Sequence, residues 1–326
     1  MKRGRHLVVV LIGAGLFTWV IAHVGLHAIL QQVKAMSIAL PILLMLSLCR
    51  LLLQTASWSM ALKGEGISAL PKRLVGIRLA SQSMGYLTFL GALLSEPMKI
   101  KLLRTPTEST IKATFLDSGV YWFTSALLAI VGCVCATFLA IHGAHYTWTI
   151  VAVTLLTLVL FLIARSKPIL SGLVRVLGKH SPSWLSRGEA IERSIRSYRL
   201  QQPALVARMF WIDVACQLLL ASEVAVVVWS LRLPIHLVTI LAIEGITRAL
   251  KMISGWVPAR LGADEGGAMS AFMAAGLSPV FGLTLALTRR MRDLLWALIG
   301  LAWLVWRAPG VTGHEKLRET YAITYR

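Results

Sequence analysis

Long apolar segments separated by short polar ones run through most of this 326-residue chain. They cover approximately residues 7–26, 38–62, 111–141, 146–164, 209–231 and 280–306. A helix needs about 20 mostly apolar residues to cross the hydrocarbon core of a bilayer. The alternating pattern of a membrane β-barrel is absent from the sequence. The pattern predicts an all-α polytopic membrane protein with about six transmembrane helices.

Two further apolar stretches do not fit a simple crossing. Residues 74–94 are followed by the basic segment SEPMKIKLLR, which the positive-inside rule places in the cytoplasm, on the side where the stretch begins. The second, WVPARLGADEGGAMS, has a proline, glycines and charges where hydropathy favours helix. Irregular backbone is tolerated in lipid only where it faces protein or water. We therefore expect two re-entrant helical hairpins, the first with corners at Gly85 and Gly91.

A short motif occurs before each of these stretches. LPKRLVGI, which contains Pro71, and LPIHLVTI, which contains Pro234, share the form LPxxLVxI. Each precedes an apolar hairpin-length stretch and then a glutamate, Glu96 or Glu265. The charge distribution places Pro71 inside and Pro234 outside, so the repeats are predicted to be inverted. Inverted repeats whose broken helices meet near the bilayer midplane are typical of transporters.

The composition supports an integral membrane protein. Only 14% of the residues are charged, whereas a soluble domain carries about 25%. The net charge of +19 fits basic cytoplasmic loops beside anionic membrane lipids, and no nucleic-acid recognition module accompanies it. The first apolar segment is longer than a signal-peptide core of about 7–15 residues, so we expect an uncleaved first span. Both termini are predicted to be cytoplasmic.

The predicted organisation has four parts. They are an N-terminal membrane half with the first hairpin (1–165), a basic cytoplasmic linker (166–208), a C-terminal membrane half with the second hairpin (209–307) and a cytoplasmic tail (308–326). Within the linker, SRGEAIERSIRSYR fits two interpretations equally. It is either an amphipathic helix on anionic headgroups or a solvated loop helix.

Charged residues within the apolar segments are the candidate site. A charge at the bilayer centre costs about 2.5–3.5 kcal/mol, so these side chains must face each other, water or a ligand. Helical spacing places Glu244, Arg248 and Lys251 on one face, and it places Arg78 and Gln82 together in the first hairpin. We expect these polar faces to line one cavity between the repeats.

Basic residues outnumber acidic ones in this set, which suits an anionic headgroup such as a phosphate. The predicted substrate-binding residues are Arg78, Gln82, Lys99, Arg248, Lys251, Arg260, Arg289 and Arg292. The residues predicted to fix the broken backbone or to gate by protonation are Glu96, Asp117, Glu244, Asp264, Glu265 and Asp293. The alternative is that these charges only form intramembrane salt bridges with one another.

No cofactor or metal is expected. Cys133 and Cys135 would point about 200° apart on a helix and cannot share a metal. The sequence has no nucleotide-binding glycine loop, no zinc-ligand spacing and no serine nucleophile motif. We therefore assign no catalytic residues and consider a transport protein more consistent with the sequence than an enzyme.

Two segments resemble the signatures of a known family. QSMGYLTFLGALLSEPMKIKLL and VPARLGADEGGAMSAFMAAGLSP are similar to the first and second signatures of the lysylphosphatidylglycerol synthase transmembrane-region, or flippase-like, family. Asp117 matches an aspartate of that family. The chain departs from the family pattern at Phe89, near a usual proline, at Ser95, in place of a glycine, and at Ser118, where an arginine often stands.

The resemblance implies transfer of a phospholipid or lipid-linked headgroup across the inner membrane. It also implies that aminoacyl transfer belongs to a separate soluble domain. We expect no such domain after Trp306, so the chain is not expected to be a lysyl-lipid synthase itself. Two alternatives remain, a membrane-embedded component of glycolipid or hopanoid-type lipid synthesis, and a scaffold for a partner lipid-biosynthesis enzyme.

Overall fold

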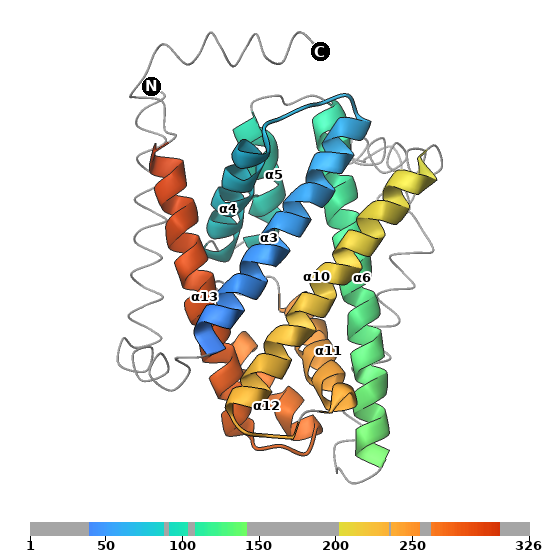
Figure 1. Ribbon diagram of the computed structural model, residues 1–326, viewed down its shortest axis with the longest axis vertical. Helices are drawn as coiled ribbons and strands as arrows, with labels where there is room; N and C mark the ends of the chain where they lie inside the picture. The colour runs from blue at the N-terminus through green and yellow to red at the C-terminus, as the bar shows by residue number, and fades with distance from the viewer. Residues whose placement is uncertain are drawn as a thin grey trace, which may run out of the picture.

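The computed structural model describes residues 39–87, 91–103, 108–141, 202–234, 236–254 and 262–306. Over these ranges the regular secondary structure consists of eight α-helices, without a strand (Figure 1). The predicted all-α class is confirmed. The predicted spans at 7–26 and 146–164, most of the linker and the tail lie outside the described residues.

The helices form two sets of four, each with two long helices enclosing two short ones. The first set is α3 (Ala39–Gly64), α4 (Pro71–Leu87), α5 (Gly91–Leu103) and α6 (Glu108–Ile141). The second is α10 (Pro203–Ser230), α11 (Leu237–Ile253), α12 (Ala263–Ala274) and α13 (Pro279–Trp306). Corresponding helices have 26 and 28, 17 and 17, 13 and 12, and 34 and 28 residues. The LPxxLVxI motif therefore has a structural counterpart, since it stands before the first short helix or at its start in both sets.

Corresponding helices run in opposite directions (Figure 1). α3 and α13 run toward the end of the molecule that holds α4 and α5, whereas α6 and α10 run toward the end that holds α11 and α12. The short helix α4 packs on α13 of the other set, and α11 packs in the same way on α6. α3 and α10 pack against each other. The two sets are thus joined through equivalent contacts.

Three of the described helices, α3, α6 and α10, are long and apolar enough to cross a membrane. They correspond to the spans predicted at 38–62, 111–141 and 209–231. α10 begins earlier than predicted, at Pro203, because proline is favourable in the first turn of a helix, where its missing N–H costs nothing. α13 matches the segment predicted at 280–306. Because it carries several charged residues, it is not among the helices apolar enough to cross a membrane.

The breaks between the short helices differ in detail from the prediction. The corner predicted at Gly85 is wrong, because α4 continues through this residue to Leu87 and α5 begins at Gly91. A single glycine costs a helix only about 1 kcal/mol, which tertiary packing readily offsets. In the second pair Gly262 has a φ of 77°, a left-handed conformation that favours glycine, and the chain is helical from Ala263 onward.

Close approaches between helices occur at glycines. A Cβ atom on Gly132 of α6 would overlap the backbone of Leu241 and Gly245 in α11. A Cβ atom on Gly300 of α13 would overlap the backbone of Leu79 and the hydroxyl of Ser83 in α4. In lipid there is no hydrophobic driving force between helices, so their association depends on close packing. Small residues allow the backbones to approach closely enough for this. The two equivalent contacts, α6 with α11 and α13 with α4, therefore use the same kind of packing.

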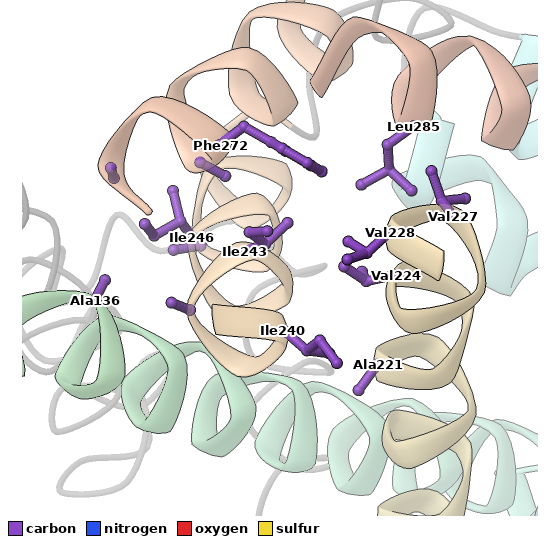
Figure 2. Packing of buried hydrophobic residues seen from close by; sticks show 14 of the residues in the cluster. Ala136, Ala221, Val224, Val227, Val228, Ile240, Ile243, Ile246, Phe272 and Leu285 are labelled. Atoms are coloured by element: carbon purple, nitrogen blue, oxygen red, sulfur yellow. The ribbon is translucent and has the colours of Figure 1, made fainter. Parts of the chain in front are cut away.

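Two large apolar clusters of buried residues pack the described helices together. The larger joins the second set to α3 and α6 and includes Val224, Ile243, Phe272 and Leu285, whose side chains point into one shared space in Figure 2. The second cluster joins α3, α4, α6 and the start of α10, and Trp58 is its largest fully buried member.

Candidate functional site

A polar cavity of about 320 Å³ lies between α3, α4, α5, α6 and α13. Both helix sets contribute to its walls. The predicted residues that line it are Arg78, Gln82, Glu96, Lys99 and Asp293, and its aromatic residues are Tyr86, Tyr121, Trp122 and Trp296. The structure thus brings five of the predicted residues, from both sets, around one cavity.

Arg78 forms a buried ion pair with Asp117. Its Nη2 lies 3.2 Å from Asp117 Oδ2, and both side chains are at most 5% exposed. The guanidinium also donates to the carbonyl oxygen of Gln54 in α3. Hydrogen-bonded partners of opposite sign are what make a buried charge tolerable. The pair ties α4 to α6 at the cavity wall.

Lys99 pairs with Glu96 one turn earlier on α5. Its Nζ donates to both carboxylate oxygens, at 2.9 Å and 3.1 Å. The ammonium also lies 6.0 Å from the centre of the Trp58 ring, within the range of a cation–π contact. Lys99 is buried, so this carboxylate and this ring provide its charge stabilisation at the cavity.

Arg50 of α3 lines the same cavity, although it was not among the predicted site residues. It stands near the middle of α3, a helix apolar enough to span a membrane. Within the described parts of the chain its side chain forms no ion pair. The sequence signal was present as a single arginine inside an apolar segment.

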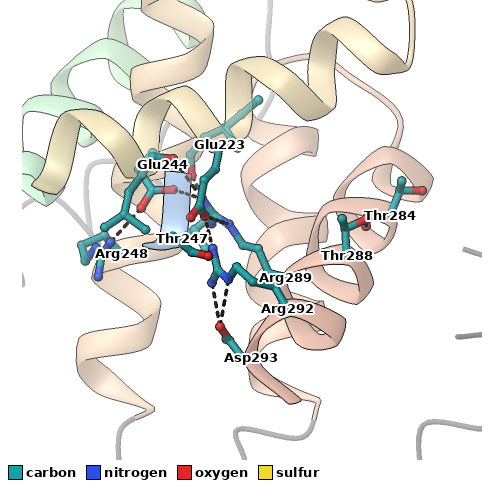
Figure 3. A network of polar contacts seen from close by, with 12 residues as sticks. Glu223, Glu244, Thr247, Arg248, Thr284, Thr288, Arg289, Arg292 and Asp293 are labelled. Atoms are coloured by element: carbon teal, nitrogen blue, oxygen red, sulfur yellow. Dashed lines mark hydrogen bonds and ion pairs between the residues drawn. The ribbon is translucent and has the colours of Figure 1, made fainter. Parts of the chain in front are cut away.

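A second group of charges forms a buried network among α10, α11 and α13 (Figure 3). Glu244 accepts from Arg248 at 2.9 Å and from Arg289 at 2.6 Å. Glu223 lies 3.4 Å from Arg289 and also pairs closely with Arg292. Two glutamates from two helices thus hold three arginines.

This network touches the cavity at two points. Arg248 Nη1 donates to the hydroxyl of Tyr121 at 3.4 Å, and Arg292 donates twice to Asp293, at 3.0 Å and 2.8 Å. Tyr121 and Asp293 both line the cavity. Arg248, Arg289 and Arg292 themselves therefore lie behind the cavity wall, each held by a carboxylate.

The remaining predicted residues lie around the second short pair. Glu265 accepts the Gly262 N–H at 2.9 Å and lies 2.8 Å from Arg290 of α13, so it both caps α12 and ties it to a neighbour. Lys251 and Asp264 stand in α11 and α12 and do not line the cavity. Arg260 lies outside the described residues.

In the part of the chain that the structure describes, no group of three or more His, Cys, Asp or Glu side chains is arranged to hold a metal ion. All four cysteines are free thiols. What the site offers chemically is therefore a set of hydrogen-bond donors, carboxylates and aromatic faces around one cavity.

Comparison with known proteins gives one match. The model of the lysylphosphatidylglycerol synthase TM region family matches residues 6–301, which include every cavity and network residue named above. Neither the curated proteins nor the solved structures give a match. The matched region takes in nearly the whole chain, both short-helix pairs and the charges between them. The chain therefore belongs to the lysylphosphatidylglycerol synthase TM region family, a family of membrane domains.

Proposed function

We propose that this protein is a flippase-like translocator that moves a phospholipid or lipid-linked headgroup across the bacterial inner membrane. The observation that carries the proposal is the cavity itself. It has cationic, anionic and aromatic walls, and two membrane-capable helices, α3 and α6, form part of them. A polar headgroup is the part of a lipid that needs such a path, because charge at the bilayer centre is costly.

In this proposal the short pairs are re-entrant hairpins that enter from opposite sides. Helices of 17 and 13 residues are about 26 and 20 Å long, shorter than the roughly 30 Å hydrocarbon core. The opposite directions of the two sets support an inverted arrangement (Figure 1). α13 would cross with the others, since Arg289, Arg290 and Arg292 are all buried in protein.

The lipid tails would stay outside the protein. Trp122 of α6 lines the cavity and is also 44% exposed, so one wall reaches the outer surface of an apolar helix. Phe115, two turns earlier on the same face of this helix, is exposed too. An apolar rim suits acyl chains that remain in the bilayer while the headgroup enters beside Trp122.

The charges would have two roles. Arg78 and Lys99 would contact the headgroup, because they line the cavity. Arg248, Arg289 and Arg292 would instead fasten the wall, because they pair with Glu244 and Glu223 and do not line the cavity. This assigns the salt-bridge alternative to the second group of charges and the ligand to the first.

Exchange of acyl-labelled phospholipids across proteoliposomes, followed by quenching of the outer leaflet, tests the proposal. We expect the protein to accelerate exchange and Arg78→Gln or Lys99→Gln to slow it at least tenfold. Lys112→Gln is the matched control, because Lys112 forms an exposed pair with Glu108 away from the cavity. Exchange no faster than in empty vesicles, with phospholipid and polyisoprenoid-linked probes alike, would overturn the proposal.

A further inference from the structure

Asp213 is a buried carboxylic acid of α10 that has no part in the translocator function as described so far. It is 1% exposed, and α10 is one of the membrane-capable helices. Among the described residues it forms no ion pair, and its Oδ2 accepts no hydrogen bond. Acidic residues inside membrane helices are costly, and in pumps and transporters they mark ion pathways and proton relays. Asp213 therefore needs a role other than packing.

The neighbours of Asp213 on its own helix show which way its side chain faces. Met209, four residues before it, belongs to the buried cluster around Trp58, which joins α10 to α3, α4 and α6. Cys216, three residues after it, donates its thiol to the carbonyl oxygen of Arg50 at 3.9 Å. Residues at these spacings share one face of a helix. Asp213 thus faces the interior of the first helix set, close to the middle of α3.

Two carboxyl groups, those of Asp117 and Asp213, act electrostatically on each other near a single guanidinium. Asp117 comes from α6 and Arg78 from α4, and both influence Asp213. The titratable neighbour on α10 is the Cys216 thiol, and Arg50 of α3 faces that thiol. The charged residues of α11, which also packs on α10, belong to the buried network in Figure 3.

Only one of these two carboxyls is paired with the guanidinium. Asp117 lies 3.2 Å from Arg78, and Asp213 has no such contact among the described residues. A buried carboxyl that lacks a bound cation is least costly when it is neutral, because its charged form loses solvation. With a proton on Asp213 the three groups are neutral together. Loss of that proton leaves one net negative charge beside Arg78.

We propose that Asp213 binds a proton and that the protein transports this proton together with the lipid headgroup. The inference rests on the translocator function proposed above and adds its energy source. Arg78 lines the cavity, so an ionised Asp213 competes with a phosphate-bearing headgroup for the same guanidinium. A proton on Asp213 removes that competition. Proton and headgroup therefore enter together and leave together.

The proton passes from water on one side of the membrane to water on the other. The Asp213 carboxylate takes it up while the cavity is open to the first side and releases it after the cavity has opened to the second. No other bond forms or breaks. Asp213 does not itself line the cavity, so this exchange accompanies the helix movements by which a transporter opens to each side in turn. By linkage, each ligand favours binding of the other.

A pH difference across proteoliposomes that contain the full-length chain tests the coupling. The rates at which a trace of acyl-labelled phospholipid or polyisoprenoid-linked probe moves inward and outward are measured, with the membrane potential held at zero by potassium and valinomycin. One pH unit supplies about 1.4 kcal/mol per proton, which sets a rate ratio of about tenfold at one proton per headgroup. We expect movement toward the alkaline side to be at least threefold faster, and the rates to become equal when nigericin collapses the gradient.

Asp213→Asn keeps the size of the side chain and fixes it in the neutral form. We expect its inward and outward rates to agree within twofold at every pH difference, whatever its overall speed. A purely structural role would change both rates alike and leave their ratio unaffected. Asp213→Glu keeps a titratable group and should retain a ratio above twofold. Glu108→Gln is the matched control, because it removes a carboxylate from an exposed pair away from the cavity and should keep the wild-type ratio.

The possible results separate the coupling from the translocator function. Wild-type exchange faster than in empty vesicles, yet with equal rates in both directions under a pH difference, would overturn the coupling and leave the translocator standing. An unchanged rate ratio in Asp213→Asn would exclude Asp213 as the proton site, and faster movement toward the acidic side would exclude co-transport. Exchange no faster than in empty vesicles would overturn both proposals. If Asp213→Asn does not fold, Asp213→Glu and the nigericin comparison on the wild type decide.

Discussion

The Arg290 guanidinium lies 2.8 Å from the carboxylate of Glu265, which also accepts the N–H of Gly262 at 2.9 Å. One side chain thus caps α12 and ties it to α13. This matters at a chain break, because the first N–H groups of a helix have no partner within the helix.

Replacing Glu265 should separate these two tasks. Glu265→Ala loses the cap, worth about 0.5–2 kcal/mol, together with a pair whose loss typically costs about 3–5 kcal/mol when buried. Glu265→Gln keeps an acceptor for Gly262 and should lose less. Asp264→Asn is the control in the same helical turn and should cost about 0.3–1 kcal/mol. Unfolding free energies from SDS titration in mixed micelles measure all three.

The contact between α6 and α11 should not tolerate a side chain larger than hydrogen at Gly132. A Cβ atom there would overlap the backbone of α11, which cannot move as a flexible side chain would. We expect Gly132→Ala to cost about 1–3 kcal/mol or more, as overpacked cores do. Gly119→Ala on the same helix meets nothing within 4 Å and should be neutral or stabilising. Similar unfolding free energies for the two variants would show that the helices do not meet at Gly132.

The ends of the long apolar helices were the feature best predicted from the sequence. The ends of α3, α6 and α13 agree with the apolar segments within a few residues, because the length and apolarity of a span follow from the hydrocarbon core. The paired short helices were also predicted, from the conflict between hydropathy and loop charge. Their corners were not, because a glycine such as Gly85 fits a helix as well as a turn.

Charge pairing was predictable only where it is local. The spacing of Glu244 and Arg248 predicts one helical face, and the structure places them 2.9 Å apart. The role of Glu223 depends on how α10 packs against α13, which no spacing along the chain reveals. Arg50 was missed for a similar reason, since only the folded cavity distinguishes it from a tolerated single charge.

Glu223 of α10 pairs with two arginines of α13, and the effect of removing it can be compared with that of removing an exposed glutamate. Glu223 is buried and faces Arg289 and Arg292, so Glu223→Ala leaves two guanidiniums without this carboxylate. We expect a loss of about 3–5 kcal/mol in unfolding free energy. Glu108→Ala breaks an exposed pair with Lys112 and should cost at most about 1 kcal/mol. A Glu223 variant as stable as the Glu108 variant would mean that the network does not hold α10 to α13.

The pair of Arg78 and Asp117 allows stability and transport to be separated. Arg78→Met leaves Asp117, which is 1% exposed, without its ion pair, and Asp117→Leu does the same to Arg78. Each single variant should lose about 3–5 kcal/mol of unfolding free energy. The double variant should recover most of that loss, because apolar replacements of a buried pair are often neutral or stabilising. A double-mutant cycle measures this coupling directly.

Lipid exchange by the same double variant decides what Arg78 does. If Arg78 contacts the headgroup, the double variant recovers most of its stability yet exchanges acyl-labelled phospholipid at least tenfold more slowly than the wild type. The charge is needed in the cavity even when the fold no longer needs the pair. Exchange at the wild-type rate would instead restrict Arg78 to holding α4 against α6.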